Sequence, residues 1–180
     1  MLPPKPSPLN LYTLLHTYLH RLLCFATLVL LQALVFGHIH IAGCAIPMPY
    51  VYFLLLLPSD TSRSQYLLWG FALGFAADMC SITPGMASAS MTLTALLTPY
   101  LVRIFSPSEK GDEAYLPSAK TMQWGPFLRC AFCLVLCHTF TFYLIEAFSL
   151  HNAWLLLVNT VGTTALTLLL IAAAERVRTR

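Results

Sequence analysis

Residues 70–103 decide the fold, and they read GFALGFAADMCSITPGMASASMTLTALLTPYLVR. An apolar segment with spaced glycines leads to a lone acid, Asp78, and a Pro84-Gly85 pair follows shortly after it. The chain then continues as an apolar segment rich in Ala, Ser and Thr. Two apolar segments of helical length on either side of a Pro-Gly turn predict a helical hairpin. We expect this hairpin to lie in a membrane and the rest of the chain to be arranged around it.

The composition of the chain indicates a single integral membrane domain. Hydrophobic residues make up 58% of the 180 residues, and charged residues make up only 9%. A soluble domain carries about 25% charged residues, so the polar residues here are too few to cover the surface of a soluble globule. Nucleic-acid binding is disfavoured as well, because the sequence has no basic stripe with interleaved aromatic residues.

Six segments have the character of transmembrane helices, which need about 20 residues to cross a hydrocarbon core of ~30 Å. They are residues 22–36 with an extension to about 40, 39–57, 65–79, 85–105, 127–148 and 153–174. The second segment is short and broken by Pro47 and Pro49, so a re-entrant segment is the alternative to a full crossing. In the fourth segment, Pro99 predicts a kink. The fold class expected is therefore an all-α integral membrane protein.

The spans divide the chain into three regions. Residues 1–21 are expected to be a cytoplasmic tail followed by the start of an interfacial helix, either the wetted entrance to the first span or a helix lying on the membrane. Residues 22–175 are expected to form one six-span membrane domain, with its longest aqueous loop, an inner one, at residues 106–125. Residues 176–180 are expected to form a basic cytoplasmic tail.

Both termini are predicted to be cytoplasmic, because positively charged residues remain on the cytoplasmic side of short loops. With six spans, all ten Lys and Arg residues of the chain fall on one side of the membrane. If the second segment does not cross, the best division of these ten residues is eight against two. The six-span arrangement is therefore favoured, and it leaves an outer face of three short turns.

Gly70 and Gly74 form a G-x-x-x-G pattern, and Asp78 follows one helical turn later. Small residues at this spacing let two helices approach closely in a membrane. The second helix belongs either to this chain or to a partner protein. Asp78 is placed near the outer interface, where an acid costs less than at the bilayer centre, and where it can end the helix and accept hydrogen bonds from the turn. A polar contact with a partner and a contact with a substrate are the alternatives.

Other reactive side chains form weaker patterns. Glu146 lies at about the depth of Asp78, but no nucleophile, metal cluster or oxyanion donor accompanies the two acids, so no catalytic residue is assigned. Cysteines near a histidine could bind a soft metal, yet buried helices also use cysteine as a small apolar filler. No metal, cofactor or disulfide is assigned to the remaining candidates. These are Cys130, Cys133, Cys137 and His138, the outer His38 and His40, and the outer pair Cys44 and Cys80.

The hairpin resembles that of the bacterial rod shape-determining protein MreD family. The pattern is a glycine-spaced apolar helix, an acid, a short turn, and a small-residue helix that ends in a basic residue. The proline-containing second segment, PMPYVYFLLLLP, resembles that of the family, and the fifth span with His138 and Glu146 resembles its longer-loop branch. The hairpin residues that carry the resemblance are Gly70, Gly74, Asp78, Pro84, Gly85 and Arg103.

The resemblance implies a multi-pass protein of the bacterial inner membrane, within the machinery that elongates the peptidoglycan wall. Members of the family have no known catalytic activity. They are expected to bind the bitopic partner MreC and to belong to an assembly with the MreB filament, a glycan polymerase and a penicillin-binding transpeptidase. The family fold is thought to be similar to the substrate-binding subunits of energy-coupling vitamin transporters. A small-molecule-binding subunit of a transporter, using Asp78, Glu146 and Gln32, is therefore the alternative function.

Overall fold

The computed structural model describes residues 11–35, 46–81, 84–106, 114–147 and 153–179. All regular elements in these ranges are helices, as expected for an all-α chain, and no strand occurs among the described residues. In chain order they are α1 (Leu11–Leu34), the 3-10 helix η2 (Pro49–Leu56), α2 (Arg63–Ser81), α3 (Met86–Phe105), α4 (Ala119–Met122), α5 (Trp124–Ala147) and α6 (Ala153–Arg178).

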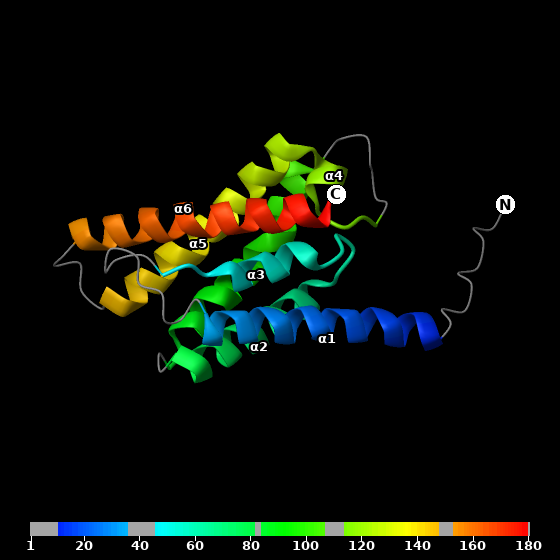
Figure 1. Cartoon of the computed structure of the whole chain (residues 1–180), viewed down its shortest axis with the longest axis horizontal. Helices are drawn as coiled ribbons and strands as arrows, with labels where there is room; N and C mark the ends of the chain where they lie inside the picture. Colours follow the sequence, from blue (N-terminus) through cyan, green and yellow to red (C-terminus); the bar gives the residue numbers. More distant parts are fainter. Residues whose placement is uncertain (1–10, 36–45, 82–83, 107–113, 148–152, 180) are drawn as a thin grey trace.

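The long elements run back and forth along one axis, so that α1 begins and α6 ends at the same end of the bundle (Figure 1). α2 begins and α3 ends at this end too, and α4 lies there. We call it the basic end, because helix-terminal cations gather there, and we call the opposite end, where α2 meets α3, the hairpin end. The cations at the basic end include Arg63, Arg103, Lys120, Arg176 and Arg178.

Each long helix packs on the next one in the chain from α2 onward. α2 lies against α3, α3 against α5, and α5 against α6, while α1 contacts α2 and η2. The short helix η2 contacts α1, α2, α3, α5 and α6. This segment is apolar on all sides, and an element of that kind is stable only when other elements cover it completely. η2 is therefore the centre of the core, and its residues from Pro49 to Leu55 are all buried.

The structure corrects the conformation of the second segment, which the sequence predicts to be a short span broken by Pro47 and Pro49. The expected span covered residues 39–57; of these, residues 39–45 lie outside the described ranges, and residues 46–48 have no regular structure. The eight residues of η2 form a 3-10 helix, whose rise of about 2 Å per residue gives a length of only about 16 Å. Pro49 at the first helical position has no N–H to leave unpaired, which suits it to begin the helix.

Several helices are longer than expected. α1 begins at Leu11, so the interfacial start and the first span form one continuous helix. α5 begins at Trp124, three residues before the expected start, and so includes Pro126. A proline in the first turn is compatible with a helix. α6 continues to Arg178, so most of the expected basic tail is its last turn, where cations interact favourably with the helix dipole. In the expected inner loop, α4 forms with a capping box between Ser118 and Thr121.

Two helices are long and apolar enough to cross a membrane by themselves, where the sequence predicts six spans. They are Trp124–Ala147 and Trp154–Arg178, and within α1 the stretch Tyr18–Leu34 is a shorter apolar helix. α2 and α3 contain many Gly, Ala, Ser and Thr residues, which lowers their hydropathy. Membrane association is supported by the two long helices, and the number of crossings stays a prediction.

Candidate functional site

Asp78 joins α2 to α3 at the hairpin end. Its side chain is only 4% exposed. One carboxylate oxygen accepts a hydrogen bond from the Ala87 N–H (2.9 Å), and the other accepts from the N–H groups of Gly85 (3.1 Å) and Ser88 (2.9 Å) and from the Ser88 hydroxyl. The first N–H groups of a helix have no partner within the helix. The hydrogen bonds expected between Asp78 and the turn are thus confirmed, and they extend into the first turn of α3.

The turn between the two helices depends on Gly85. Its φ is 90°, a left-handed conformation that costs a residue with a side chain about 1–2 kcal/mol. Its N–H reaches back to Asp78, and its carbonyl accepts from the Ala89 N–H at 3.0 Å. Pro84 and Gly85 are exposed, so the turn is held by backbone hydrogen bonds rather than by burial.

Gly70 and Gly74 face α3, so the partner helix in this contact belongs to the same chain. A Cβ on Gly70 would lie 2.5 Å from the Ala95 Cβ. A Cβ on Gly74 would lie 2.5 Å from the Ala87 carbonyl oxygen and 2.6 Å from the Ser88 Cα. Both glycines are buried, and the face that they form is closed to any other helix.

A groove lies on the outer side of the same hairpin. α2 and α3 form a shallow, open hollow of about 590 Å³. Small residues of α3 line it, and larger apolar side chains from both helices flank it. We call it the hairpin groove, and its lining consists of Leu67, Phe71, Gly85, Ser88, Ala89, Thr92, Leu93 and Leu96. The sequence analysis assigned the small-residue contact to the glycine face of α2 and missed this groove beside it, although Ser88 belongs to both.

Threonines on α6 support the irregular segment that precedes η2. The Ile46 N–H donates to the Thr163 hydroxyl at 3.2 Å, and the Met48 N–H donates to the Thr167 hydroxyl at 3.0 Å. Pro47 between them has no N–H to satisfy. Threonines one turn apart on α6 therefore satisfy every backbone donor of this stretch, as a non-helical chain inside an apolar bundle requires.

The two secondary candidates on α5 lie in different environments. His138 is fully buried, and its Nε2 is 2.8 Å from the Tyr50 hydroxyl of η2. Its ring packs edge-on against the Tyr50 ring, with centroids 5.2 Å apart. Glu146, near the end of α5, is exposed. His138 thus ties α5 to the central segment, whereas Glu146 lies on the surface.

A buried acid near the end of α6, Glu175, joins three parts of the chain. It is 0% exposed. It accepts hydrogen bonds from the Tyr52 hydroxyl of η2 and, at 2.8 Å, from the Ala119 N–H of α4. The Arg178 guanidinium pairs with it at 3.3 Å. We call this group the Glu175 junction. The sequence analysis missed it; the available signal was an acid three residues before an arginine at the end of an apolar helix.

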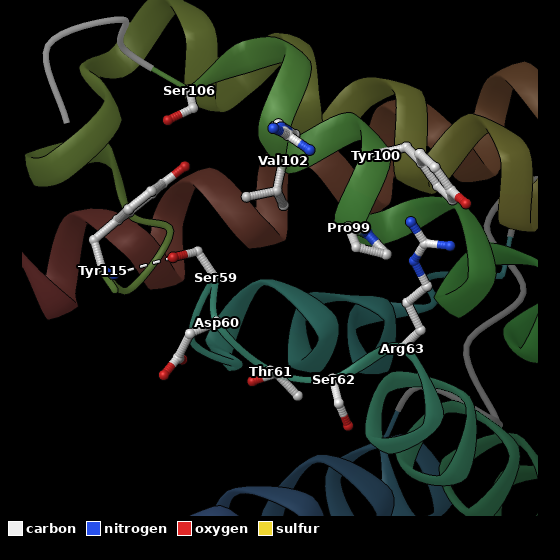
Figure 2. A pocket seen from close by; sticks show the side chains of 11 residues that line it. Ser59, Asp60, Thr61, Ser62, Arg63, Pro99, Tyr100, Val102, Ser106 and Tyr115 are labelled. Carbon is white, nitrogen blue, oxygen red and sulfur yellow. Dashed lines mark hydrogen bonds between the residues drawn. The ribbon is translucent and has the colours of Figure 1, made fainter. Parts of the chain in front are cut away.

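A polar cleft of about 440 Å³ opens at the basic end between residues 59–63, which lead into α2, and the last turns of α3. Arg63 and Arg103 both line it, and Figure 2 shows Arg63 next to the Tyr100 ring. The backbone of Ser59 and that of Tyr115 close one side, because the Ser59 N–H donates to the Tyr115 carbonyl at 2.8 Å and the Tyr115 N–H donates to the Ser59 hydroxyl at 3.0 Å. Arg103 therefore lies at the opposite end of α3 from the other hairpin residues of the expected site.

The cysteine candidates in the described part of the chain are free thiols. Cys130 is buried in α5, and Cys133 and Cys137 are partly buried. Among the described residues, no three His, Cys, Asp or Glu side chains gather in a way that could hold a metal ion. Three further candidates of the sequence analysis lie outside the described residues: His38, His40 and Cys44.

Comparisons with protein-family models, with curated proteins and with solved structures give no match to this chain.

Proposed function

We propose that this chain is a non-catalytic adaptor of the bacterial cell-elongation machinery, embedded in the inner membrane by six passes. In this proposal it binds an MreC-like bitopic protein through membrane helices. An MreB-like filament, a glycan polymerase and a penicillin-binding transpeptidase complete the assembly. The family resemblance of the hairpin suggests the assembly, and the hairpin groove is the observation that carries the binding role.

The hairpin groove has the features of a docking site for one transmembrane helix. Apolar side chains alone do not drive helix association in lipid, so close backbone approach over small residues contributes most of the attraction. Ala89 on α3 is exposed and lies beside Ser88 and Thr92 in the lining of the groove. From Gly85 to Leu96 the lining extends along α3 for about 17 Å at ~1.5 Å per residue. That length matches about half of a membrane-spanning partner helix.

The path of the chain supports the six-pass placement. The long helices and η2 run alternately along one axis (Figure 1), and the basic end carries cations from the ends of α2, α3 and α6. The positive-inside rule places such an end in the cytoplasm. Both termini are then cytoplasmic, and η2 makes its pass inside the bundle, where protein rather than lipid surrounds its irregular backbone.

The test fills the groove without touching the core. Ala89→Leu adds bulk at an exposed position in the groove lining, so we expect the MreC-like partner to be lost on co-purification and the cells to become round. Ala165→Leu is the matched control, because Ala165 is equally exposed on α6 and lies outside the groove. If cells with Ala89→Leu keep their rod shape and the partner still co-purifies, at equal protein levels, the groove is not the docking site.

The transporter alternative needs free polar groups in a ligand cavity near the hairpin end. Asp78, its first candidate, directs both carboxylate oxygens to the start of α3, and Glu146 is exposed near the end of α5. We therefore propose the adaptor and not the transporter subunit.

A further inference from the structure

The cleft at the basic end brings together two cations from neighbouring helices. Arg63 is the first residue of α2, and Arg103 lies in the last turn of α3. Both line the same cavity of about 440 Å³, which falls within the usual size of small-molecule sites of about 300–1,000 Å³. Three serines, Ser59, Ser62 and Ser106, line the same cleft as the arginines.

The charge of this cleft is not neutralised within the described part of the chain. Neither arginine forms an ion pair with a described residue; the salt bridge found there joins Arg178 to Glu175. Asp60 is the acid in the lining, and in Figure 2 its carboxylate points away from the α3 side of the cleft. Two guanidinium groups that form no ion pair with a described residue favour an anion, and the planar fork of arginine binds a phosphate group in a bidentate geometry.

The orientation of Arg63 is supported by an aromatic ring. Its guanidinium carbon lies 5.0 Å from the centroid of the Tyr100 ring, a distance at which the ring attracts the cation. This contact uses the face of the guanidinium and leaves its N–H groups available for an anion. Tyr100 is itself exposed, as is Leu97 one turn earlier on α3, so an apolar surface continues from the cleft along the helix.

We propose that this cleft binds a phosphate group, carried either by an anionic phospholipid headgroup or by free phosphate. The proposal rests on the membrane placement given above and is independent of the adaptor role. In that placement, the basic end faces the cytoplasmic leaflet, where basic pockets between membrane helices bind anionic headgroups. A lipid bound here would place its phosphate between Arg63 and Arg103 and an acyl chain along Leu97 and Tyr100.

The experiment measures binding to the purified full chain in a neutral detergent. Native mass spectrometry with added dioleoyl phosphatidylglycerol or dioleoyl phosphatidylcholine tests the lipid source. Thermal unfolding in sodium phosphate against sodium chloride at equal ionic strength tests the soluble source. The variants are Arg63→Gln, Arg103→Gln and their combination, and Arg129→Gln is the control because Arg129 is exposed on α5 and does not line the cleft.

We expect phosphatidylglycerol to bind in preference to phosphatidylcholine. Its affinity should fall about fivefold in each single variant and about 30-fold in the double variant, since a basic residue near an anionic headgroup contributes a factor of about five. Arg129→Gln should bind like the wild type. The double variant Arg63→Lys with Arg103→Lys keeps both charges, so we expect it to retain most of the binding. It is measured in addition, in case either glutamine variant proves unstable.

Each outcome decides the proposal. Loss of phosphatidylglycerol binding in the double variant supports it with a lipid as the source. Stabilisation by phosphate that disappears in the double variant supports it with free phosphate as the source. The proposal is overturned if the double variant binds both probes as the wild type does, or if the wild type binds neither. The test is independent of partner co-purification, so the adaptor proposal and this one can fail separately.

Discussion

Each end of the bundle is stabilised by one buried acid. The hydrogen-bond partners of the two acids lie at very different distances along the sequence. Asp78 at the hairpin end is 4% exposed and Glu175 at the basic end is 0% exposed. Asp78 accepts hydrogen bonds from residues seven to ten positions away, all at the start of the next helix. Glu175 accepts from Ala119, 56 positions away, and from Tyr52, 123 positions away.

Asp78 therefore makes local contacts, and Glu175 makes long-range contacts. Asp78 completes the hydrogen bonding of α3 and thereby fixes how α3 leaves α2. Glu175 joins η2, α4 and α6, so its hydrogen bonds form only when these three elements have assembled. We expect substitutions at the hairpin end to disturb one helix pair severely, and substitutions at the basic end to loosen several elements moderately.

The largest loss is expected from Gly74→Ala, which tests the closeness of the hairpin. The added methyl group would lie within 2.8 Å of three backbone atoms of α3, and backbone cannot move aside as a flexible side chain can. Overpacking of this kind costs about 3 kcal/mol or more of the free energy of unfolding. The measurement is unfolding by sodium dodecyl sulfate in dodecyl maltoside micelles.

Gly125→Ala is the control for this variant, because a Cβ there meets no atom within 4 Å. We expect it to be neutral or slightly stabilising, as alanine favours a helix over glycine by about 1 kcal/mol. Equal stability of the Gly74 and Gly125 variants would show that α2 and α3 are not in close contact.

Asp78→Asn should come next, with a loss of about 2–3 kcal/mol. The amide keeps one acceptor oxygen but directs an NH₂ group at backbone N–H groups, which can only donate, and a buried donor without an acceptor costs about 1–3 kcal/mol. Asp60→Asn is the control at an exposed position, where we expect less than about 0.5 kcal/mol. The same unfolding assay measures both variants, and a tolerated Asp78→Asn would contradict the capping role.

Glu175→Gln should cost less, about 1.5 kcal/mol, although its side chain is buried as completely. The Tyr52 hydroxyl can rotate to accept a hydrogen bond from the new amide, so fewer donors are left unpaired. Hydrogen exchange would show the long-range character, as faster exchange in η2, α4 and the end of α6 together. If exchange rises in α6 alone, Glu175 does not join the three elements.

The smallest effect is expected from Thr167→Val, which removes the acceptor of the Met48 N–H. One buried hydrogen bond contributes about 1 kcal/mol, and valine preserves the shape. Thr92→Val is the control, since the Thr92 hydroxyl donates to the Ser88 carbonyl of its own helix. The free energies of unfolding of the two variants should differ by about 1 kcal/mol. A difference near zero would show that Thr167 does not stabilise the irregular segment before η2.

The sequence predicted what depends on neighbouring residues and missed what depends on distant ones. The hairpin was predictable because its acid, its Pro-Gly turn and its spaced glycines lie within one short stretch. The conformation of η2 was not, because an apolar run bounded by prolines fits several conformations and surrounding helices decide among them. The sequence signal of the Glu175 junction was limited to Glu175 and Arg178, and its partners Tyr52 and Ala119 were not predictable because they come from other segments.

The same reasoning explains the outcome for the expected site residues. Gly70 and Gly74 were recognised as a contact face, but the sequence left the identity of the second helix open. Packing of α2 on α3 answers that question, and it also creates the hairpin groove beside the contact. Arg103 was recognised as the end of the hairpin, yet its place beside Arg63 in the polar cleft appears only when both helices are placed.

The most direct test of the account is the side of the membrane on which each end of the bundle lies. In a chain whose six cysteines are replaced by alanine, Ser81→Cys marks the hairpin end and Lys120→Cys marks the basic end. Both positions are exposed. We expect a membrane-impermeant maleimide to label Ser81→Cys from outside the inner membrane and Lys120→Cys only after the membrane is opened. Labelling of both positions from the same side would contradict the account.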